Sequence, residues 1–328
     1  MFSFSLRIVV AVLSISIFSS VTCDEPFSWA LEGTVSSMFA TQGLTDRMED
    51  SYLLIENVNG TGIYGIFDGH SGNSSSKFAA FKLAELIETE LIKCASNPRD
   101  CISSGELNGK FTIDGMLRYF IGRIESLLKT AYTVKKERSG TTCLIAIVEK
   151  KRLTVANVGD SRGVMCDSKG KAIPLSRDHK PDRPDEAQRI KEAGGKIELR
   201  GEWRVNGLAV SRFLGGFFQK GNDNVIIATP DILTFNLDEH EPSFMILASI
   251  GLWSVMTNQE AVDFVIKECS NEPDFGAQKL AAKAFFSFSL SNISIIIVKF
   301  TKGQYVVRSA YIGIRSANGG VRVPHIRK

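Results

Sequence analysis

Residues 141–175 constrain the fold more than any other part of the sequence, because they have the pattern of four short strands joined by tight turns. The segments TTCLIAIVEK and RLTVANVGD are apolar and rich in β-branched residues, and only a charged turn separates them. RGVMCD and KAIPL follow, on either side of the turn Ser168-Lys169-Gly170. Strands that follow one another through turns this short pair antiparallel, so the segment predicts an antiparallel meander.

Helical patterns occur in neighbouring segments rather than between successive strands. Residues 74 to about 94 and 112 to about 135 both place apolar residues at helical spacing, and Pro184 opens a shorter helix. The other strands are expected at 52–57, 62–67, 225–228, 244–248 and 293–300. Hairpins combined with paired helices predict an α+β layered fold rather than a doubly wound parallel sheet. No linker-like stretch interrupts residues 35–300, so one domain is expected there.

The first 23 residues, MFSFSLRIVVAVLSISIFSSVTC, have the composition of a targeting segment. Arg7 precedes an apolar run, and the small residues Val21 and Cys23 suit a cleavage site before Asp24. Alternatively, the apolar stretch 2–21 is long enough to span a bilayer as an uncleaved anchor. In both interpretations the chain enters the secretory pathway, as an endoplasmic reticulum membrane-anchored protein or as a lumenal or secreted one.

The charge distribution excludes one class of partner. The formal net charge of +3 is too small to indicate a nucleic-acid-binding protein. The tail, residues 301–328, is basic and contains no acid, and it is interpreted as a solvated end, with a contact to a membrane surface or a partner as the alternative. Its basic residues are Lys302, Arg308, Arg315, Arg322, Arg327 and Lys328.

Cysteines and glycosylation sequons bear on the compartment. Of six cysteines, Cys94 and Cys101 form the one close pair, and no C-x-x-C motif occurs, so a structural zinc site is not expected. A lumenal domain would join this pair in a disulfide. The N-x-S/T sequons at Asn59, Asn73 and Asn292 matter only in that compartment.

Acidic residues recur at the ends of the predicted strands. The candidates for metal ligation are Glu49, Asp50, Asp68, Gly69 through its carbonyl, and Asp160. Oxygen ligands that converge from strand ends suit Mg²⁺ or Mn²⁺, and a pair of such ions activates a bridging water for attack on a phosphoryl group. His70, beside this set, is a candidate general acid for the leaving group. Each acid taken alone has a simpler interpretation, as a solvated residue near a turn.

Seven motifs together resemble the metal-dependent protein phosphatase 2C (PPM) family, closest to its protein phosphatase 1-like branch. They are GIFDGHSG, SGTTCLIAIV, LTVANVGDSRGVMC, PLSRDHKPDRPDEAQRIKEAGGKI, VNGLAVSRFLGG, ILASIGLWSVMTNQEAV and SNISIIIVKF. The resemblance covers about residues 35–300. It implies a PPM-type four-layer sandwich, with two antiparallel sheets flanked by helix pairs and a dinuclear metal site at one end. It also implies hydrolysis of phosphoserine and phosphothreonine by a metal-bound water.

The resemblance assigns roles to residues at matching positions. Glu49 and Asp50 match the acidic pair, Asp68 the bridging carboxylate, Gly69 the carbonyl ligand, His70 the general acid, and Asp160 the acid of a third metal. Other positions depart from the family pattern: Ile250, Ser254 and Ser291 stand where it has aspartates, Thr45 where it has the phosphate-clamping arginine, and Gly215-Gly216 where it has Gly-Asp.

These departures predict a weakened metal site. Ile250 offers no ligand atom, and Ser291 is a poor substitute for a carboxylate. Arg47, two residues beyond Thr45, would reach the same face of a strand and is the candidate for phosphate binding. We therefore expect impaired phosphatase activity with weak Mg²⁺ or Mn²⁺ binding, or alternatively an inactive pseudophosphatase with a binding or regulatory role. The expected partner is a phosphoprotein, the chain is expected to be a monomer, and its N-terminus could associate with a membrane.

Overall fold

The computed structural model describes residues 28–32, 35–58, 60–97, 101, 112–221, 224–269, 276–301, 305 and 312–315. The predicted targeting segment 1–23, the sequon residue Asn59 and most of the basic tail lie outside these residues. None of the helices in the described part is both long and apolar enough to cross a bilayer.

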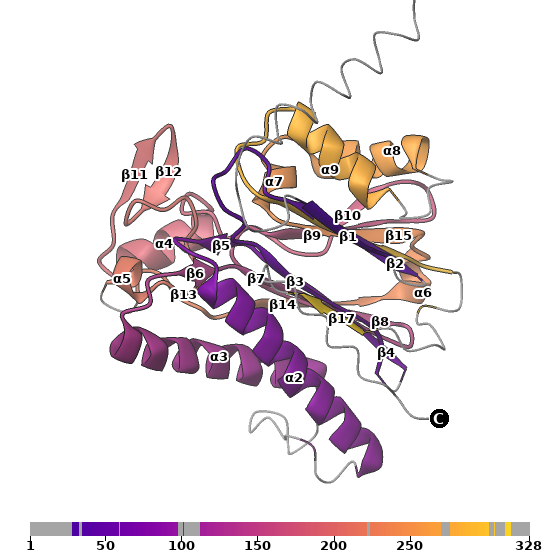
Figure 1. Ribbon diagram of the computed structural model, residues 1–328, viewed down its shortest axis with the longest axis horizontal. Helices are drawn as coiled ribbons and strands as arrows, with labels where there is room; N and C mark the ends of the chain where they lie inside the picture. Colours follow the sequence, from indigo (N-terminus) through magenta and orange to yellow (C-terminus); the bar gives the residue numbers. More distant parts are fainter. Residues whose placement is uncertain are drawn as a thin grey trace, which may run out of the picture.

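Two six-stranded antiparallel sheets lie face to face and form the centre of the molecule (Figure 1). The first has the order β1 (Ser28–Glu32), β2 (Ser36–Thr41), β16 (Ile293–Lys299), β15 (Phe244–Ala248), β9 (Arg162–Cys166), β10 (Ala172–Pro174). The second has the order β14 (Asp231–Asn236), β8 (Arg152–Val158), β7 (Cys143–Glu149), β4 (Thr61–Phe67), β3 (Ser51–Val58), β17 (Ile312–Arg315). The four strands predicted at 141–175 form as β7, β8, β9 and β10, but the continuous meander is wrong: β7 pairs with β8 in the second sheet and β9 with β10 in the first, so the chain crosses between the sheets after β8.

Helices cover the outer face of each sheet. The second sheet carries α2 (Ser74–Ser96) and α3 (Ile113–Lys135), and the first carries α7 (Ile250–Trp253), α8 (Asn258–Glu268) and α9 (Ala277–Phe286) (Figure 1). Strand side chains alternate between the two environments: Leu54 and Ile66 pack between the sheets, whereas Leu53 and Ile63 pack under the helices. The predicted α+β fold of four layers is therefore confirmed.

The expected strand at 225–228 is wrong. Only one isolated bridge forms there, between Ile227 and Arg212. Arg189 donates to the carbonyl oxygens of Asn224 and Val225 (3.0 Å each), which a neighbouring strand would otherwise use. Ile226 is buried in a small separate cluster, so the apolar run packs beside α4 (Pro184–Glu192) instead of entering a sheet.

The remaining elements were not expected from the pattern because most are very short. They are β5 (Gly69–His70), β6 (Gly140–Thr141), the hairpin β11 (Ile197–Arg200) with β12 (Glu202–Val205), β13 (Leu214–Gly215), α5 (Phe217–Lys220) and α6 (Leu237–His240). The β11–β12 hairpin projects from one end of the sandwich (Figure 1).

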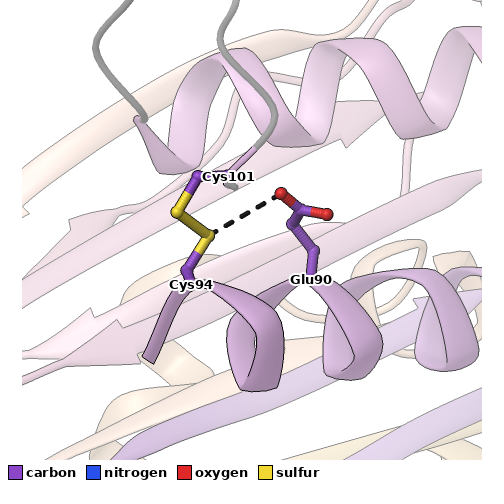
Figure 2. A group of neighbouring side chains, drawn as sticks. All are labelled: Glu90, Cys94 and Cys101. Atoms are coloured by element: carbon purple, nitrogen blue, oxygen red, sulfur yellow. Dashed lines mark hydrogen bonds between the residues drawn. A yellow bond between two sulfur atoms is a disulfide. The ribbon is translucent and has the colours of Figure 1, made fainter. Parts of the chain in front are cut away.

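Cys94 and Cys101, the pair that the sequence predicts, are joined in a disulfide at the end of α2 (Figure 2). Glu90 Oε1 lies 3.7 Å from the Cys94 sulfur. Among the described residues, these three make up the one group of acidic, cysteine or histidine side chains whose ligand atoms all lie within 4.8 Å of one another. Because the disulfide uses both sulfurs, this group offers no thiolate to a metal.

Candidate metal centre

Asp50 and Asp68 meet at one end of the sandwich because of the pairing of two strands. Asp50 immediately precedes β3, and Asp68 immediately follows β4. Ser51 lies opposite Phe67 in this antiparallel pair, so the start of β3 and the end of β4 share one edge. Thr142 fixes Asp68 further, since its hydroxyl accepts from the Asp68 amide and its amide donates to the Asp68 carbonyl (2.9 Å each).

The two carboxylates form an acidic pair, with Asp50 buried and Asp68 partly buried, and neither makes an ion pair with a described residue. Asp50 accepts a hydrogen bond from the Ser294 hydroxyl (2.7 Å), while its Oδ1 is buried with no hydrogen-bond partner among the described residues. Burial raises the pKa of Asp50 to about 6. Burial, and next the charges of Asp50 and Asp160, raise the pKa of Asp68 well above its usual value. An acidic pair with a buried, orphaned oxygen fits a bound divalent cation.

The other two predicted carboxylates are engaged elsewhere. Glu49 Oε1 accepts from the amide of Gly72 (2.7 Å). Asp160 accepts from the ammonium group of Lys180 (2.5 Å), with which it forms an ion pair. The structure therefore brings Asp50 and Asp68 together and leaves Glu49 and Asp160 each with a partner of its own.

Gly69 allows the close backbone approach that this arrangement needs. A Cβ atom at this position would lie 2.2 Å from the carbonyl oxygen of Glu49. Any side chain would therefore push apart the two segments that carry Glu49 and Asp68.

Ile250 approaches the site through its backbone rather than its side chain. It begins α7, and its amide donates to Asp68 Oδ2 (3.1 Å). Its half-buried side chain packs with the apolar residues under α8 and α9. Ser291 is also half-buried, and its hydroxyl makes no hydrogen bond with a described residue. The family pattern has aspartate at positions 250 and 291. Neither Ile250 nor Ser291 supplies a charged ligand there.

Comparison with known proteins assigns the chain to a family. The family model for protein phosphatase 2C matches residues 34–293. The chain belongs to the protein phosphatase 2C family. It is 43% identical over 277 residues to protein phosphatase 1L of Bos taurus, a match that covers 83% of this chain and 74% of the relative.

Solved structures show that the chain has the phosphatase 2C fold. A sex-determining protein of C. elegans superposes with a TM-score of 0.68 at 23% identity, covering 84% of this chain and 66% of that one. A serine-threonine phosphatase 2C from Toxoplasma gondii gives 0.67 at 22% identity, covering 84% of this chain and 100% of that one.

His70 of this phosphatase 2C chain is uncharged at neutral pH. Burial, and next the charge of Lys220, lower its pKa to about 4. Both ring nitrogens are buried with no hydrogen-bond partner among the described residues, and the ring packs against the edge of Phe213 with centroids 4.7 Å apart. A neutral imidazole is a weak proton donor, so this environment does not favour the predicted role of general acid.

Thr45, at the phosphate-clamp position of the family, belongs to a hydrogen-bonded loop. The amide nitrogen of Asn292 donates to the Thr45 hydroxyl (2.6 Å), and the same nitrogen reaches the carbonyl of Arg47 (2.9 Å). Arg47 is exposed and lies in a bend, not in a strand, so the alternation argument for its direction was wrong. Its guanidinium makes no ion pair with a described residue, which leaves it available to an anion.

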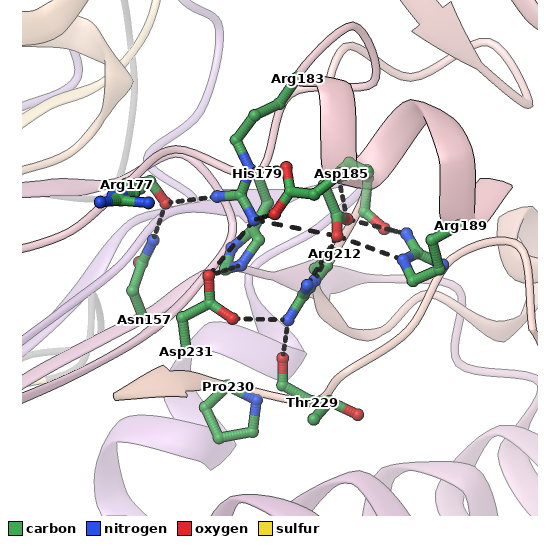
Figure 3. A network of polar contacts seen from close by, with 12 residues as sticks. Asn157, Arg177, His179, Arg183, Asp185, Arg189, Arg212, Thr229, Pro230 and Asp231 are labelled. Carbon is green, nitrogen blue, oxygen red and sulfur yellow. Dashed lines mark hydrogen bonds and ion pairs between the residues drawn. The ribbon is translucent and has the colours of Figure 1, made fainter. Parts of the chain in front are cut away.

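A buried ionic network beside the site was missed by sequence reasoning (Figure 3). Glu186 of α4 is 1% exposed and accepts hydrogen bonds from Arg212 (2.6 Å), Arg189 (2.8 Å) and the Ser211 hydroxyl (2.6 Å). Arg212 also donates to Asp231 at the start of β14 (3.0 Å). The sequence does show acidic and basic residues clustered around 177–189 and 211–212, which could have indicated an ionic network. Their spacing alone did not show that they contact one another.

His179 connects this network to the loop after β8. Its Nδ1 accepts from the amide of Gly159 (3.0 Å), and its Nε2 lies 3.1 Å from an oxygen of Asp231. This contact ties the loop after β8, which carries Asp160, to β14.

Proposed function

We propose that the chain is a serine/threonine phosphatase family member whose hydrolytic activity is impaired. The observation that supports this most directly is the contact at Asp68: a backbone amide of Ile250 meets the carboxylate where the family has an aspartate side chain. With Ser291 also neutral, the residues present fit one divalent cation, held by Asp68, the Gly69 carbonyl, Asp50 and waters. Such a cation, when bound, would polarise a water and a phosphoryl oxygen.

A binding role is the alternative that follows from the same features. The loop at Thr45 is fixed by Asn292, Glu49 and Asp160 have partners, and Arg47 makes no ion pair within the part of the chain that the structure describes. A site organised in this way could hold a phosphorylated side chain of a partner protein without turning it over. Such a pseudophosphatase would act by binding a phosphoprotein.

Calorimetric titration with Mn²⁺ tests the metal stoichiometry. We expect one weak site, because Ile250 and Ser291 supply no carboxylate and Asp50 and Asp68 remain as the two carboxylates that meet there. The double variant Ile250→Asp/Ser291→Asp should bind Mn²⁺ more tightly, since it restores two carboxylates. Ile250→Asn/Ser291→Asn, of the same shape but neutral, is the matched control and should not. Two tight sites in the unmodified protein would contradict the proposal.

We also propose that the domain lies in the secretory lumen or is secreted if the N-terminal segment is cleaved, and that an uncleaved segment anchors it to a membrane. The disulfide at the end of α2 supports an oxidising compartment. Closing such a short loop stabilises the fold by about 2–4 kcal/mol.

Glycosylation and thiol accessibility distinguish the lumenal orientation. We expect glycans at Asn59 and Asn73 but not at Asn292, which is 7% exposed and donates its amide to Gln42 (3.0 Å) and Arg47 (2.9 Å). Cys94 and Cys101 should resist alkylation until reduced, whereas the buried thiols, such as Cys143, should react only after unfolding. Unchanged gel mobility after endoglycosidase treatment, with both paired thiols free, would indicate a cytosolic domain.

A further inference from the structure

Three large apolar side chains stand in solvent beside the metal centre. Phe286, Phe288 and Leu290, which we call the phenylalanine patch, are 73%, 81% and 77% exposed. They occupy the end of α9 and the loop that leads to β16, directly before Ser291. Leu44, also exposed, lies in the neighbouring loop: a Cβ at Gly43 would sit 2.8 Å from the Ser291 carbonyl. An apolar group of this kind at a functional end of a protein marks an interaction surface.

The backbone holds Phe288 outward at an energetic cost. Its φ angle is +63°, a left-handed conformation that bulky side chains rarely adopt. The loop folds back so that the amide of Ser289 donates to the carbonyl of Ala284 (3.2 Å), and Ser289 itself is buried. Glycine or asparagine is usual in this conformation at a helix end. Because the Phe288 side chain is 81% exposed, packing within this fold does not explain why a phenylalanine is present.

The N-terminal segment enters the fold at the same end of the first sheet. Ser28, the first described residue, pairs with Thr41, and Thr41 pairs with Ile293, which lies three residues after Leu290. The apolar stretch 2–21 ends close to this point in the sequence: residues 22–28 span at most about 25 Å when extended. A bilayer that held residues 2–21 would therefore lie close to the phenylalanine patch.

The charges around the patch suit an anionic surface. Residues 277–292 contain Lys279 and Lys283 and no acid; both lysines are exposed, and Lys279 donates to the carbonyl oxygen of Glu268 (3.2 Å). The exposed Arg47 lies in the adjacent loop. Glu260 of α8, the acid that interacts with Lys283, already serves as part of the helix cap. Apolar side chains flanked by lysines are typical of segments that lie in the headgroup region of a membrane.

We propose that the phenylalanine patch inserts into the surface of an anionic phospholipid bilayer, with Lys283 at the headgroups. The inference rests on the proposed retention of residues 1–23 as an anchor. The docked orientation brings the loops that carry Thr45 and Ser291 to the membrane surface, so a phosphoprotein partner would be met there.

Quenching by brominated lipids tests this contact in the full chain, reconstituted in vesicles of phosphatidylcholine and phosphatidylserine after its mass has confirmed an intact N-terminus. Phe288→Trp is compared with Phe81→Trp, which substitutes an exposed phenylalanine of α2 on the opposite layer of the sandwich. After subtraction of the native tryptophan signal, we expect strong quenching of Phe288→Trp, largest for bromines roughly 5–10 Å deep, and little of Phe81→Trp. Lys283→Gln should weaken the quenching.

Each failure has a distinct result. If the intact chain does not float with the vesicles, both the anchor and the patch contact are overturned. If it floats but Phe288→Trp is quenched no more than Phe81→Trp, the patch contact alone is overturned. A third result would be the absence of lipid quenching together with a doubling of the protein's mass at higher concentration. If Phe288→Ser abolishes that doubling, the patch contacts a second copy of the chain and not a membrane. Phosphatase activity enters none of these readouts, so the outcome is independent of the proposed impairment.

Discussion

The purified protein is expected to hydrolyse a phosphothreonine peptide at least about 1000-fold more slowly than a family member with an intact metal site, even at saturating Mn²⁺. Losing one well-placed electrostatic contributor commonly costs about 100- to 1000-fold in turnover. Here Ile250 and Ser291 remove two carboxylates, and Thr45 removes the clamp on the phosphate. The losses fall within one site and need not add, so the expected reduction is at least that of the largest single loss.

The measurement is phosphate release from the peptide, with and without Mn²⁺, in the unmodified protein and in Asp68→Asn. Residual activity that arises in this site should disappear in Asp68→Asn, whereas activity from a contaminant should not. Turnover within tenfold of an intact relative, abolished by Asp68→Asn, would show that Asp50, Glu49 and Asp160 rearrange to rebuild the site, and the proposed impairment would be wrong.

Glu186→Gln is expected to reduce the free energy of unfolding by about 3–5 kcal/mol. The substitution removes the carboxylate charge that Arg212 and the partly exposed Arg189 share, and leaves the half-exposed Asp231 as the remaining carboxylate partner of Arg212. Removing one partner of a buried ion pair is strongly destabilising. Urea denaturation followed by circular dichroism measures the loss. Asp185→Asn is the matched control on the same helix, because its pair with Arg183 is exposed and should contribute at most about 1 kcal/mol. A loss in Glu186→Gln no larger than in the control would contradict the assignment.

The stability difference between the unmodified protein and Glu186→Gln is also expected to depend on pH. Burial alone would raise the pKa of Glu186, but hydrogen bonds from Arg212, Arg189 and Ser211 lower it from 4.5 to about 2. A carboxylate with a lowered folded-state pKa stabilises the folded protein above its unfolded pKa and loses this effect as the pH falls. The difference in stability between the unmodified protein and Glu186→Gln should therefore be largest above about pH 5 and shrink towards pH 2. A difference that stays constant over this range would contradict the prediction.

The sequence predicted regular elements well where their pattern was long or their turns were tight. The two hairpins within 141–175 and the helices at 74–94 and 112–135 formed as expected, because period-2 and period-3.6 patterns specify which face is buried. The sequence did not show that the second hairpin belongs to the other sheet. The segment 225–228 failed because four apolar residues have no period of their own. The carbonyl oxygens of Asn224 and Val225 instead accept hydrogen bonds from Arg189, which lies some 35 positions earlier in the chain.

For the candidate site, the sequence by itself determined which side chains exist at each position. It established that Ile250 and Ser291 supply no carboxylate, that Asp50, Asp68 and Gly69 are retained, and that Thr45 stands at the clamp position. These conclusions need no coordinates, since an isoleucine cannot ligate a hard cation in any conformation.

Only the tertiary structure decided which of the retained groups are still free to act. It paired Asp160 with Lys180, engaged Glu49 with Gly72, and left Asp50 and Asp68 as an acidic pair. It also made His70 a neutral ring. Charge state and hydrogen-bond partners depend on burial and on distances between segments far apart in the chain, and no local pattern encodes those distances.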